Sequence, residues 1–299
     1  MSKSKPKKCL VAILKGGLGN QLFIYAASKA AALRTNRDLY LDTRIGYQKD
    51  RFGREYMLHQ LGIRDPEVPP ALSLSPHLSH WKHKWKRAWN KCLPESKRNY
   101  IADRSGEELL RLESHAKVIH VVGYWQREEN FMDQSKPIRE SIQIPPPGEK
   151  EIQEKGKALA ETPSIFLHIR RDRFPKLLDF QYYQDAIDRI VQRLSNPTFL
   201  IFGDTIDTSL QQLDFHGYTV EVSPGTKSLS PLNDLWLMSR CPHGILSNSS
   251  FAWWGAWFGE PFHAQRNILA PANYGWPMSA SKTWETIPNT ILASDSMGP

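Results

Sequence analysis

Side chains that can bind an anion follow three apolar stretches in the second half of the chain. Arg170 and Arg171 come directly after SIFLHI, and two neighbouring guanidinium groups can hold phosphate oxygens through paired hydrogen bonds. Asp204 follows TFLIFG, and an acidic residue in a dinucleotide site accepts hydrogen bonds from ribose hydroxyls. The pattern predicts a nucleotide-diphosphate site. The alternative is a solvated ion pair between Arg170 and Asp172.

The third apolar stretch, HGIL at residues 243–246, leads into the polar run SNSS at residues 247–250. Asn248 or Ser249 is expected to be the N-cap of a helix that begins there. A helix N-terminus with the hydroxyl groups of Ser249 and Ser250 attracts anions, because its first N–H groups lack acceptors inside the helix. These residues therefore extend the predicted diphosphate site.

A regular alternation of strands and helices must position these side chains. The predicted strands are 164–169, 198–202, 218–222, 243–247 and 267–270, and the predicted helices are 149–161, 180–194, 206–213, 232–240 and 249–258. Such a series folds into a parallel sheet covered by helices on both faces. Because the carboxyl ends of parallel strands share one edge, His168, Arg170, Arg171 and Asp204 are expected there with residues 248–250.

The first half shows a looser version of the same alternation. Strands are predicted at 9–14, 38–42 and 116–122, with a helix at 21–34. A glycine-rich turn with Gly17 and Gly19 joins the first strand to the helix, followed by Asn20 and Gln21. It has neither the Gly-Lys-Ser/Thr of a P-loop nor the third glycine of the dinucleotide fingerprint.

The proline-rich segment 143–148 (QIPPPG) is the predicted domain boundary. We expect an α/β, GT-B-like fold of two Rossmann-type domains that face each other across a cleft. Residues 1–145 would form an N-terminal acceptor-side domain, and residues 149–270 a C-terminal nucleotide-sugar domain. Residues 271–299 are expected to be a tail that packs back across the domains.

Composition excludes several classes of protein. The three cysteines are few and far apart, and no cluster of cysteine and histidine has the spacing of a metal site. No apolar run is long enough for a signal peptide or a membrane span. We therefore expect a cytoplasmic protein without a metal or other cofactor.

The net charge of +8 is concentrated in residues 1–8 and 81–98, so a nucleic-acid partner is not expected. Trp81, Trp85 and Trp89 stand on one face of a predicted basic helix. This face could lie in an anionic membrane interface, which would make the protein peripheral to the inner membrane. The interpretation we favour is that the tryptophans pack on the core, because apolar stripes of helices usually do so.

The sequence resembles the α-1,2-fucosyltransferase family of inverting, GDP-fucose-dependent glycosyltransferases. Three stretches carry the resemblance, namely GGLGNQLFIYAAS at 16–28, LHIRR at 167–171 and DLWLMSRCPHGILSNSSFAWWGAW at 234–257. Supporting motifs are GYWQREENF at 123–131, YYQDAI at 182–187, FGDT at 202–205 and LAPANYGW at 269–276.

The resemblance implies a GT-B-like fold, GDP-β-L-fucose as donor, catalysis without a metal, and a galactose-terminated glycan as acceptor. It places Arg170 at the β-phosphate, His168 and Asp204 near guanosine, and Ser249 and Ser250 near the phosphates. It also places Asn20 and Gln21 of the glycine-rich turn in the cleft between the domains.

One departure from the family concerns the catalytic base. The family reads His-x-Arg-Arg-x-Asp followed by an aromatic residue, whereas here Arg173 stands at the aspartate position and Asp172 one place earlier. Asp172 is the first candidate for the general base. Asp179 and a carboxylate of the first domain are the alternatives.

The expected function is inverting transfer of L-fucose to a hydroxyl of a terminal β-galactoside, giving an α-1,2-fucosylated precursor of a bacterial surface polysaccharide. One alternative is a fucosyltransferase of another linkage or acceptor, such as α-1,6 transfer or transfer to a protein. The other is a non-catalytic protein that binds polyanions or membranes through the basic segments.

Overall fold

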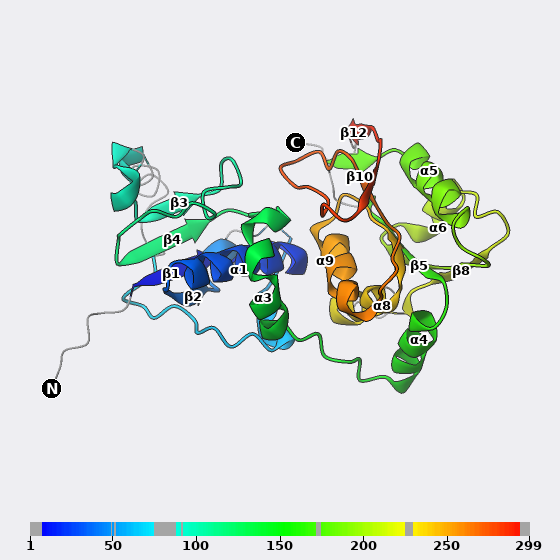
Figure 1. Ribbon diagram of the computed structural model, residues 1–299, viewed down its shortest axis with the longest axis horizontal. Helices are drawn as coiled ribbons and strands as arrows, with labels where there is room; N and C mark the ends of the chain where they lie inside the picture. The colour runs from blue at the N-terminus through cyan, green and yellow to red at the C-terminus, as the bar shows by residue number, and fades with distance from the viewer. Residues whose placement is uncertain are drawn as a thin grey trace. The chain divides into compact units, whose positions relative to one another are not determined.

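The computed structural model describes residues 8–293 apart from 49, 51, 75–87, 91, 172–174 and 225–229. It divides into two compact units, Met1–Gln143 and Ile144–Pro299, with the division at the start of the predicted proline-rich boundary (Figure 1). Each unit is built around its own parallel sheet. Among the described residues, no helix is both long enough and apolar enough to cross a membrane.

The first unit contains a four-stranded sheet in the order β2-β1-β4-β3, and all its pairs are parallel. Its strands are β1 (Cys9–Ile13), β2 (Asp38–Asp42), β3 (Tyr100–Ala102) and β4 (Val118–Val122). Its helices are α1 (Leu18–Arg34), α3 (Ser135–Ser141) and the short 3-10 turns η1 (Ile45–Tyr47), η2 (Leu58–Leu61), η3 (Glu95–Lys97), η4 (Glu128–Asn130) and η5 (Met132–Gln134). Helix α1 is buried along most of its length and follows the glycine-rich turn directly.

The second unit contains a six-stranded sheet in the order β11-β10-β9-β5-β7-β8, again with parallel pairs throughout. Its strands are β5 (Ser164–Ile169), β7 (Thr198–Gly203), β8 (Thr219–Val222), β9 (His243–Ile245), β10 (Ile268–Pro271) and β11 (Glu285–Ile287). Strands β7 and β8, which follow β5 in the sequence, lie on one side of it in the sheet. The later strands β9, β10 and β11 lie on the other side. The order therefore reverses between β5 and β9.

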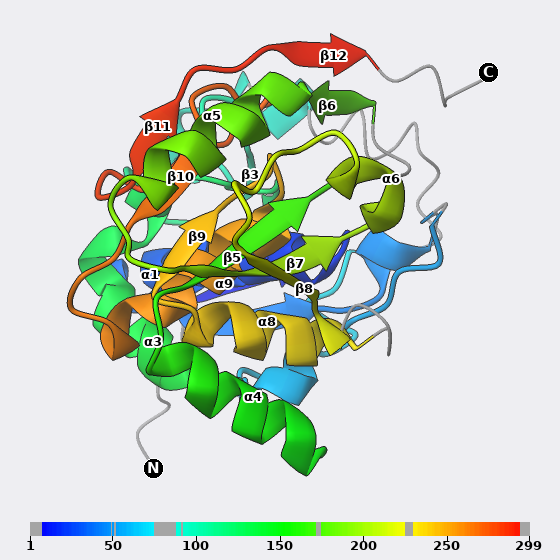
Figure 2. The same cartoon turned by 90° about the vertical axis from the view of Figure 1, so that its right-hand side faces the viewer.

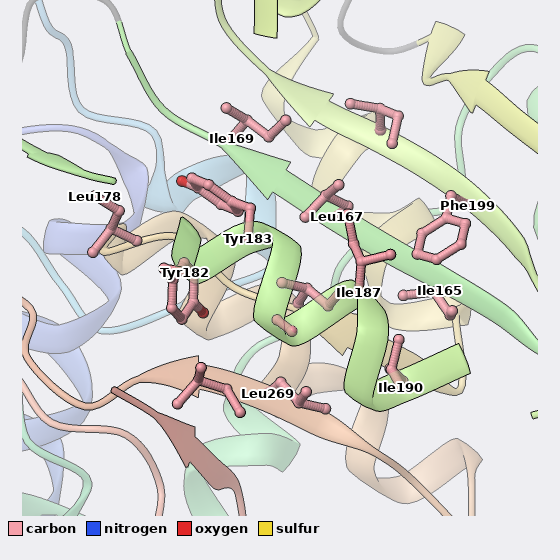
Figure 3. Packing of buried hydrophobic residues seen from close by; sticks show 14 of the residues in the cluster. Ile165, Leu167, Ile169, Leu178, Tyr182, Tyr183, Ile187, Ile190, Phe199 and Leu269 are labelled. Atoms are coloured by element: carbon pink, nitrogen blue, oxygen red, sulfur yellow. The ribbon is translucent and has the colours of Figure 1, made fainter. Parts of the chain in front are cut away.

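Helices cover both faces of this sheet (Figure 2). They are α4 (Lys150–Ala160), α5 (Phe180–Val191), α6 (Ile206–Leu210), α8 (Pro231–Arg240), α9 (Ser250–Gly259) and the 3-10 turn η6 (Glu260–Phe262). Figure 3 shows the core under α5, where Tyr183 and Ile187 pack against Ile165 and Leu167 of β5. Successive side chains of a strand point to opposite faces, so His168 lies on the other face, where its ring is 6.3 Å from that of Phe251 in α9.

The C-terminal residues correct one prediction. Residues 271–293 do not form a separate tail, because β11 pairs with β10 and extends the second sheet. Strand β12 (Ile291–Ala293) pairs antiparallel with β6 (Lys176–Leu178) of the same unit. These short strands, together with β3, were not predicted because three residues are too few for a period to be visible in the sequence.

A glycine in β9 permits the close packing of β9 on β5. A Cβ atom on Gly244 would lie 2.2 Å from Cε1 of Phe166, which is fully buried. We expect Gly244→Ala to lower the free energy of unfolding by about 1–3 kcal/mol, because the ring cannot move without displacing its neighbours. The measurement is urea denaturation followed by circular dichroism.

The matched control is Gly148→Ala, because a Cβ atom at Gly148 would meet nothing within 4 Å. If Gly244→Ala and Gly148→Ala had the same free energy of unfolding, the role of Gly244 in the packing of β9 on β5 would be contradicted.

Candidate active site at the carboxyl edge of the second sheet

The predicted polar strand ends meet at the carboxyl edge of the second sheet. Ile169 pairs with Gly203 and Leu167 with Ile245, so β7 and β9 flank the end of β5. In open α/β sheets, ligands bind outside the carboxyl ends of the strands at the point where the strand order reverses. The described residues place that point between β5 and β9, where Nδ1 of His168 lies 2.7 Å from Oγ of Ser247.

His168 is a neutral hydrogen-bonding group in this position. Burial, and after it the positive charge of Arg170, lowers the pKa of His168 from 6.5 to about 3. The imidazole can therefore offer one donor and one acceptor without adding charge at neutral pH. Its partner Ser247 is fully buried and was not among the predicted site residues. The only signal for Ser247 was its place at the start of the polar run SNSS.

Two adjacent arginines have different surroundings. The side chain of Arg170 is partly exposed and close enough to His168 for its charge to act on the imidazole. The guanidinium group of Arg171 instead lies 4.3 Å from the ring centroid of Phe180, and its Nη1 donates to the carbonyl of Leu178 at 2.5 Å. Through these contacts the Arg171 side chain is joined to Leu178 of β6 and Phe180 of α5, and its predicted contact with the donor stays a prediction.

Asp204, which follows β7, fixes the backbone of Arg171. The backbone N–H of Arg171 donates to Oδ1 of Asp204. Strand β7 can approach this closely because Gly203 has φ +131°, and a Cβ atom there would lie 1.7 Å from the carbonyl oxygen of Ile169. The predicted contact of Asp204 with guanosine stays a prediction.

The run SNSS begins helix α9, as predicted. Ser249 is the N-cap residue, and its Oγ accepts from the backbone N–H of Phe251 at 3.2 Å. Asn248 is fully buried, and its Nδ2 donates to the carbonyls of Lys176 at 3.0 Å and Tyr274 at 3.4 Å. Asn248 thus fixes two loops at the sheet edge, while Ser250, which is partly exposed, stands in the first turn of α9.

The general base is not located by the structure. Asp172, the first candidate, lies outside the described residues, together with Arg173 and Phe174. Asp179 is the N-cap of α5, and its two oxygens accept from the backbone N–H groups of Tyr182 at 3.0 Å and Thr290 at 3.2 Å. These hydrogen bonds give Asp179 a structural role, which disfavours it as a base.

Gln21, predicted to follow the glycine-rich turn, lies in the first turns of α1 and is fully buried. Its Nε2 donates to the carbonyls of Gly16 at 2.9 Å and Glu55 at 2.8 Å, and its Oε1 accepts from the N–H of Met57 at 2.9 Å. Gln21 therefore joins the start of α1 to the loop at Glu55 and Met57, and its predicted place in the cleft stays a prediction. Gly17 is the N-cap of α1 and Gly19 lies in its first turn. Asn20, which is partly exposed, accepts from Gln126 at 2.8 Å.

Residues 1–7, 81–87 and 91 of the two basic segments lie outside the described residues, and docking on a membrane stays a prediction. Of the predicted tryptophan stripe, only Trp89 is described, and it is 72% exposed. This contradicts packing of Trp89 on the core. In the part of the chain that the structure describes, no group of His, Cys, Asp and Glu side chains could hold a metal ion.

Comparison with known proteins supplies the family. The sequence profile described as "Glycosyl transferase family 11" matches residues 9–260. The chain belongs to this family. The match confirms the resemblance to α-1,2-fucosyltransferases and makes the protein a glycosyltransferase.

Two relatives with assigned sugar-transfer activities agree with this assignment. An α-1,2-colitosyltransferase of Escherichia coli is 28% identical over 268 residues, which cover 83% of this chain and 87% of that protein. The galactoside α-(1,2)-fucosyltransferase 2 of Mus musculus is 30% identical over 135 residues, which cover 39% of this chain and 35% of that protein.

The fold is shared with a solved fucosyltransferase. A mutant of Arabidopsis thaliana FUT1 in complex with GDP has a TM-score of 0.51 and 13% identity, over 93% of this chain and 73% of that chain. The likeness, together with the two parallel sheets, confirms the prediction of an α/β, GT-B-type fold. The predicted facing of the domains across a cleft stays a prediction.

Because His168 is buried, we expect the free energy of unfolding to depend on pH. The unfolded chain binds a proton at this residue near pH 6.5, whereas the folded chain does so only near pH 3, so stability is complete above pH 6.5 and falls below it. Between pH 7 and pH 4.5 the loss should be about 3 kcal/mol.

Urea denaturation of the wild type and of His168→Asn at both pH values measures this loss. The variant removes the titrating group but leaves the other histidines unchanged. An equal fall in stability for both chains would show that His168 is not the group responsible.

Proposed function

We propose that the chain transfers L-fucose from GDP-β-L-fucose, with inversion, to a hydroxyl of a terminal β-galactoside. The product would be an α-1,2-fucosylated precursor of a surface polysaccharide. The observation that carries the proposal is the group formed by His168, Arg170 and the N-terminus of α9, at the point where the strand order of a family 11 chain reverses. The GDP bound to FUT1, which has a similar fold, supports the donor, and the α-1,2 linkage in the names of two relatives supports the linkage.

Each group has a defined role in the proposed reaction. The acceptor hydroxyl attacks the anomeric carbon from the face opposite GDP, and a carboxylate, with Asp172 as first candidate, accepts its proton. Arg170 and the first turn of α9 stabilise the negative charge that develops on the departing diphosphate. His168 is neutral, so it forms hydrogen bonds to the nucleotide and does not compete for the phosphate charge.

Colitose is a second candidate for the transferred sugar, because one relative is a colitosyltransferase that aligns with most of this chain. Colitose is L-fucose without the 3-hydroxyl group. A site built to hydrogen-bond that hydroxyl would reject the deoxy sugar by about 10⁴-fold, whereas an apolar site would discriminate by about 10² or less. Turnover of GDP-fucose and GDP-colitose with one β-galactoside acceptor separates the two donors.

Arg170 is expected to act mainly in the transition state. The variant Arg170→Ala should lower kcat by about 10²-fold or more, because one charge-stabilising donor on the leaving group is lost. Release of GDP from GDP-fucose in the presence of a β-galactoside is the measurement.

A matched control is Arg193→Ala, because Arg193 is exposed, lies just after α5, and forms an ion pair with Glu285 of β11 at 2.6 Å. Activity of Arg170→Ala near that of this control would remove Arg170 from the proposed mechanism.

We propose further that no metal ion takes part. Arginine and a helix N-terminus can neutralise a diphosphate without a divalent cation, so we expect full turnover in excess EDTA. A strict requirement for Mg²⁺ or Mn²⁺, restored by adding back the metal, would contradict this proposal.

A further inference from the structure

A second group of side chains gathers at the carboxyl edge of the first sheet, and the proposed mechanism does not use it. Strands β2, β1 and β4 are neighbours there, with Ile13 opposite Asp42 and Ala12 opposite Val121. Lys15 follows β1 and Tyr124 follows β4, and the Lys15 ammonium group lies 4.2 Å from the centroid of the Tyr124 ring.

The loop after β2 adds to this group. Turn η1, which contains Tyr47, packs on the end of β1, since a Cβ atom on Gly46 would lie 1.9 Å from the carbonyl oxygen of Leu14. Burial is the main cause of the raised pKa of Tyr47, and Asp50, Tyr124 and Arg54 are close enough to act on it as well. We call the following six residues the Tyr124 cluster: Lys15, Tyr47, Asp50, Phe52, Arg54 and Tyr124.

The polar members of the cluster are fixed in place. Oδ1 of Asp50 accepts from the backbone N–H of Phe52 at 2.8 Å and of Arg54 at 3.2 Å. The guanidinium group of Arg54 lies 4.4 Å from the centroid of the Phe52 ring, and its charge also acts on Tyr124. Arg54 therefore lies against the Phe52 ring and is near enough to Tyr124 for its charge to act there.

Both rings are held where water reaches them. Tyr124 is 37% exposed and Phe52 is 48% exposed. Oδ2 of Asp103 accepts from the N–H groups of Tyr124 at 3.2 Å and Trp125 at 2.7 Å, and Trp125 takes a φ of +54°, which is strained for a bulky residue. Such strain persists where the surrounding structure requires it, most often at ligand sites.

The chemistry of the cluster fits a sugar. A β-galactoside has one face of C–H groups that can lie against an aromatic ring, and a rim of hydroxyl groups. Lys15 and Arg54 can donate to hydroxyl oxygens, and Asp50 can accept from hydroxyl hydrogens. We infer that the Tyr124 cluster binds the terminal hexose of the acceptor glycan, with Tyr124 and Phe52 against its apolar face. This inference rests on the proposed function, because that function supplies a galactoside acceptor.

The test is direct binding of methyl β-D-galactoside to the full chain in the presence of GDP, followed by saturation-transfer NMR titration. Tyr124→Ala and Phe52→Ala should each weaken binding by about tenfold, the loss expected for one stacked ring. Tyr124→Phe keeps the ring and should stay within about twofold to threefold of the wild type.

The matched control is Phe262→Ala. Phe262 is also an exposed ring, at 53%, with the Arg240 guanidinium group 4.0 Å from its centroid, but it belongs to turn η6 of the second unit. Binding that is unchanged in Tyr124→Ala, or weakened equally in Phe262→Ala, overturns the inference.

GDP affinity, measured by calorimetry on the same samples, separates this inference from the proposed function and shows that each variant is folded. A wild-type chain that binds GDP but no galactoside overturns the inference and does not contradict the proposed donor site. A chain that binds galactoside through the cluster but no GDP supports the inference and overturns the proposed function.

Discussion

The pairing of β5 between β7 and β9 is the constraint on which the candidate site depends. Strand β5 is fully buried, and its pairing places the ends of three strands at one edge of the sheet. Because side chains alternate along a strand, Leu167 and Ile169 enter the core under α5, while His168 faces Phe251 and Ser247. A slip of one residue would exchange these faces, placing an imidazole in an apolar core and two apolar side chains at the site.

The chain on either side of residues 172–174 is held by groups that were themselves candidates for binding the donor. Asp204 accepts from the backbone of Arg171, the Arg171 side chain donates to Leu178, and Asn248 donates to Lys176. These hydrogen bonds hold Arg171, Lys176 and Leu178 in place before a ligand arrives, so no free energy is lost in ordering these residues at the moment of reaction. Arg170 and Arg171 are both partly exposed at this edge.

In the first unit, too, polar side chains hold the loops near the sheet edge. Gln21 is buried and connects Gly16 with the loop at Glu55 and Met57, which holds the glycine-rich turn against the following loop. Asp103 holds the strained backbone at Trp125 and so presents Tyr124 at the sheet edge. In both units, therefore, buried or partly buried polar side chains fix the loops, and the neighbouring Asn20 and Arg170 are partly exposed.

The sequence by itself determined the alternation of strands and helices, the carboxyl edge that gathers residues 168–171, 204 and 248–250, and the start of a helix within the run SNSS. These features depend on local patterns, namely short continuous apolar runs for buried strands and the preference of serine and asparagine for a helix N-cap. Only the tertiary structure decided which of two adjacent arginines is held within the protein, that Gln21 is buried, and that residues 285–293 join the second unit. The partners in these cases, such as Phe180 for Arg171 and Glu55 for Gln21, come from other loops or elements, and no local pattern records which groups folding will bring together.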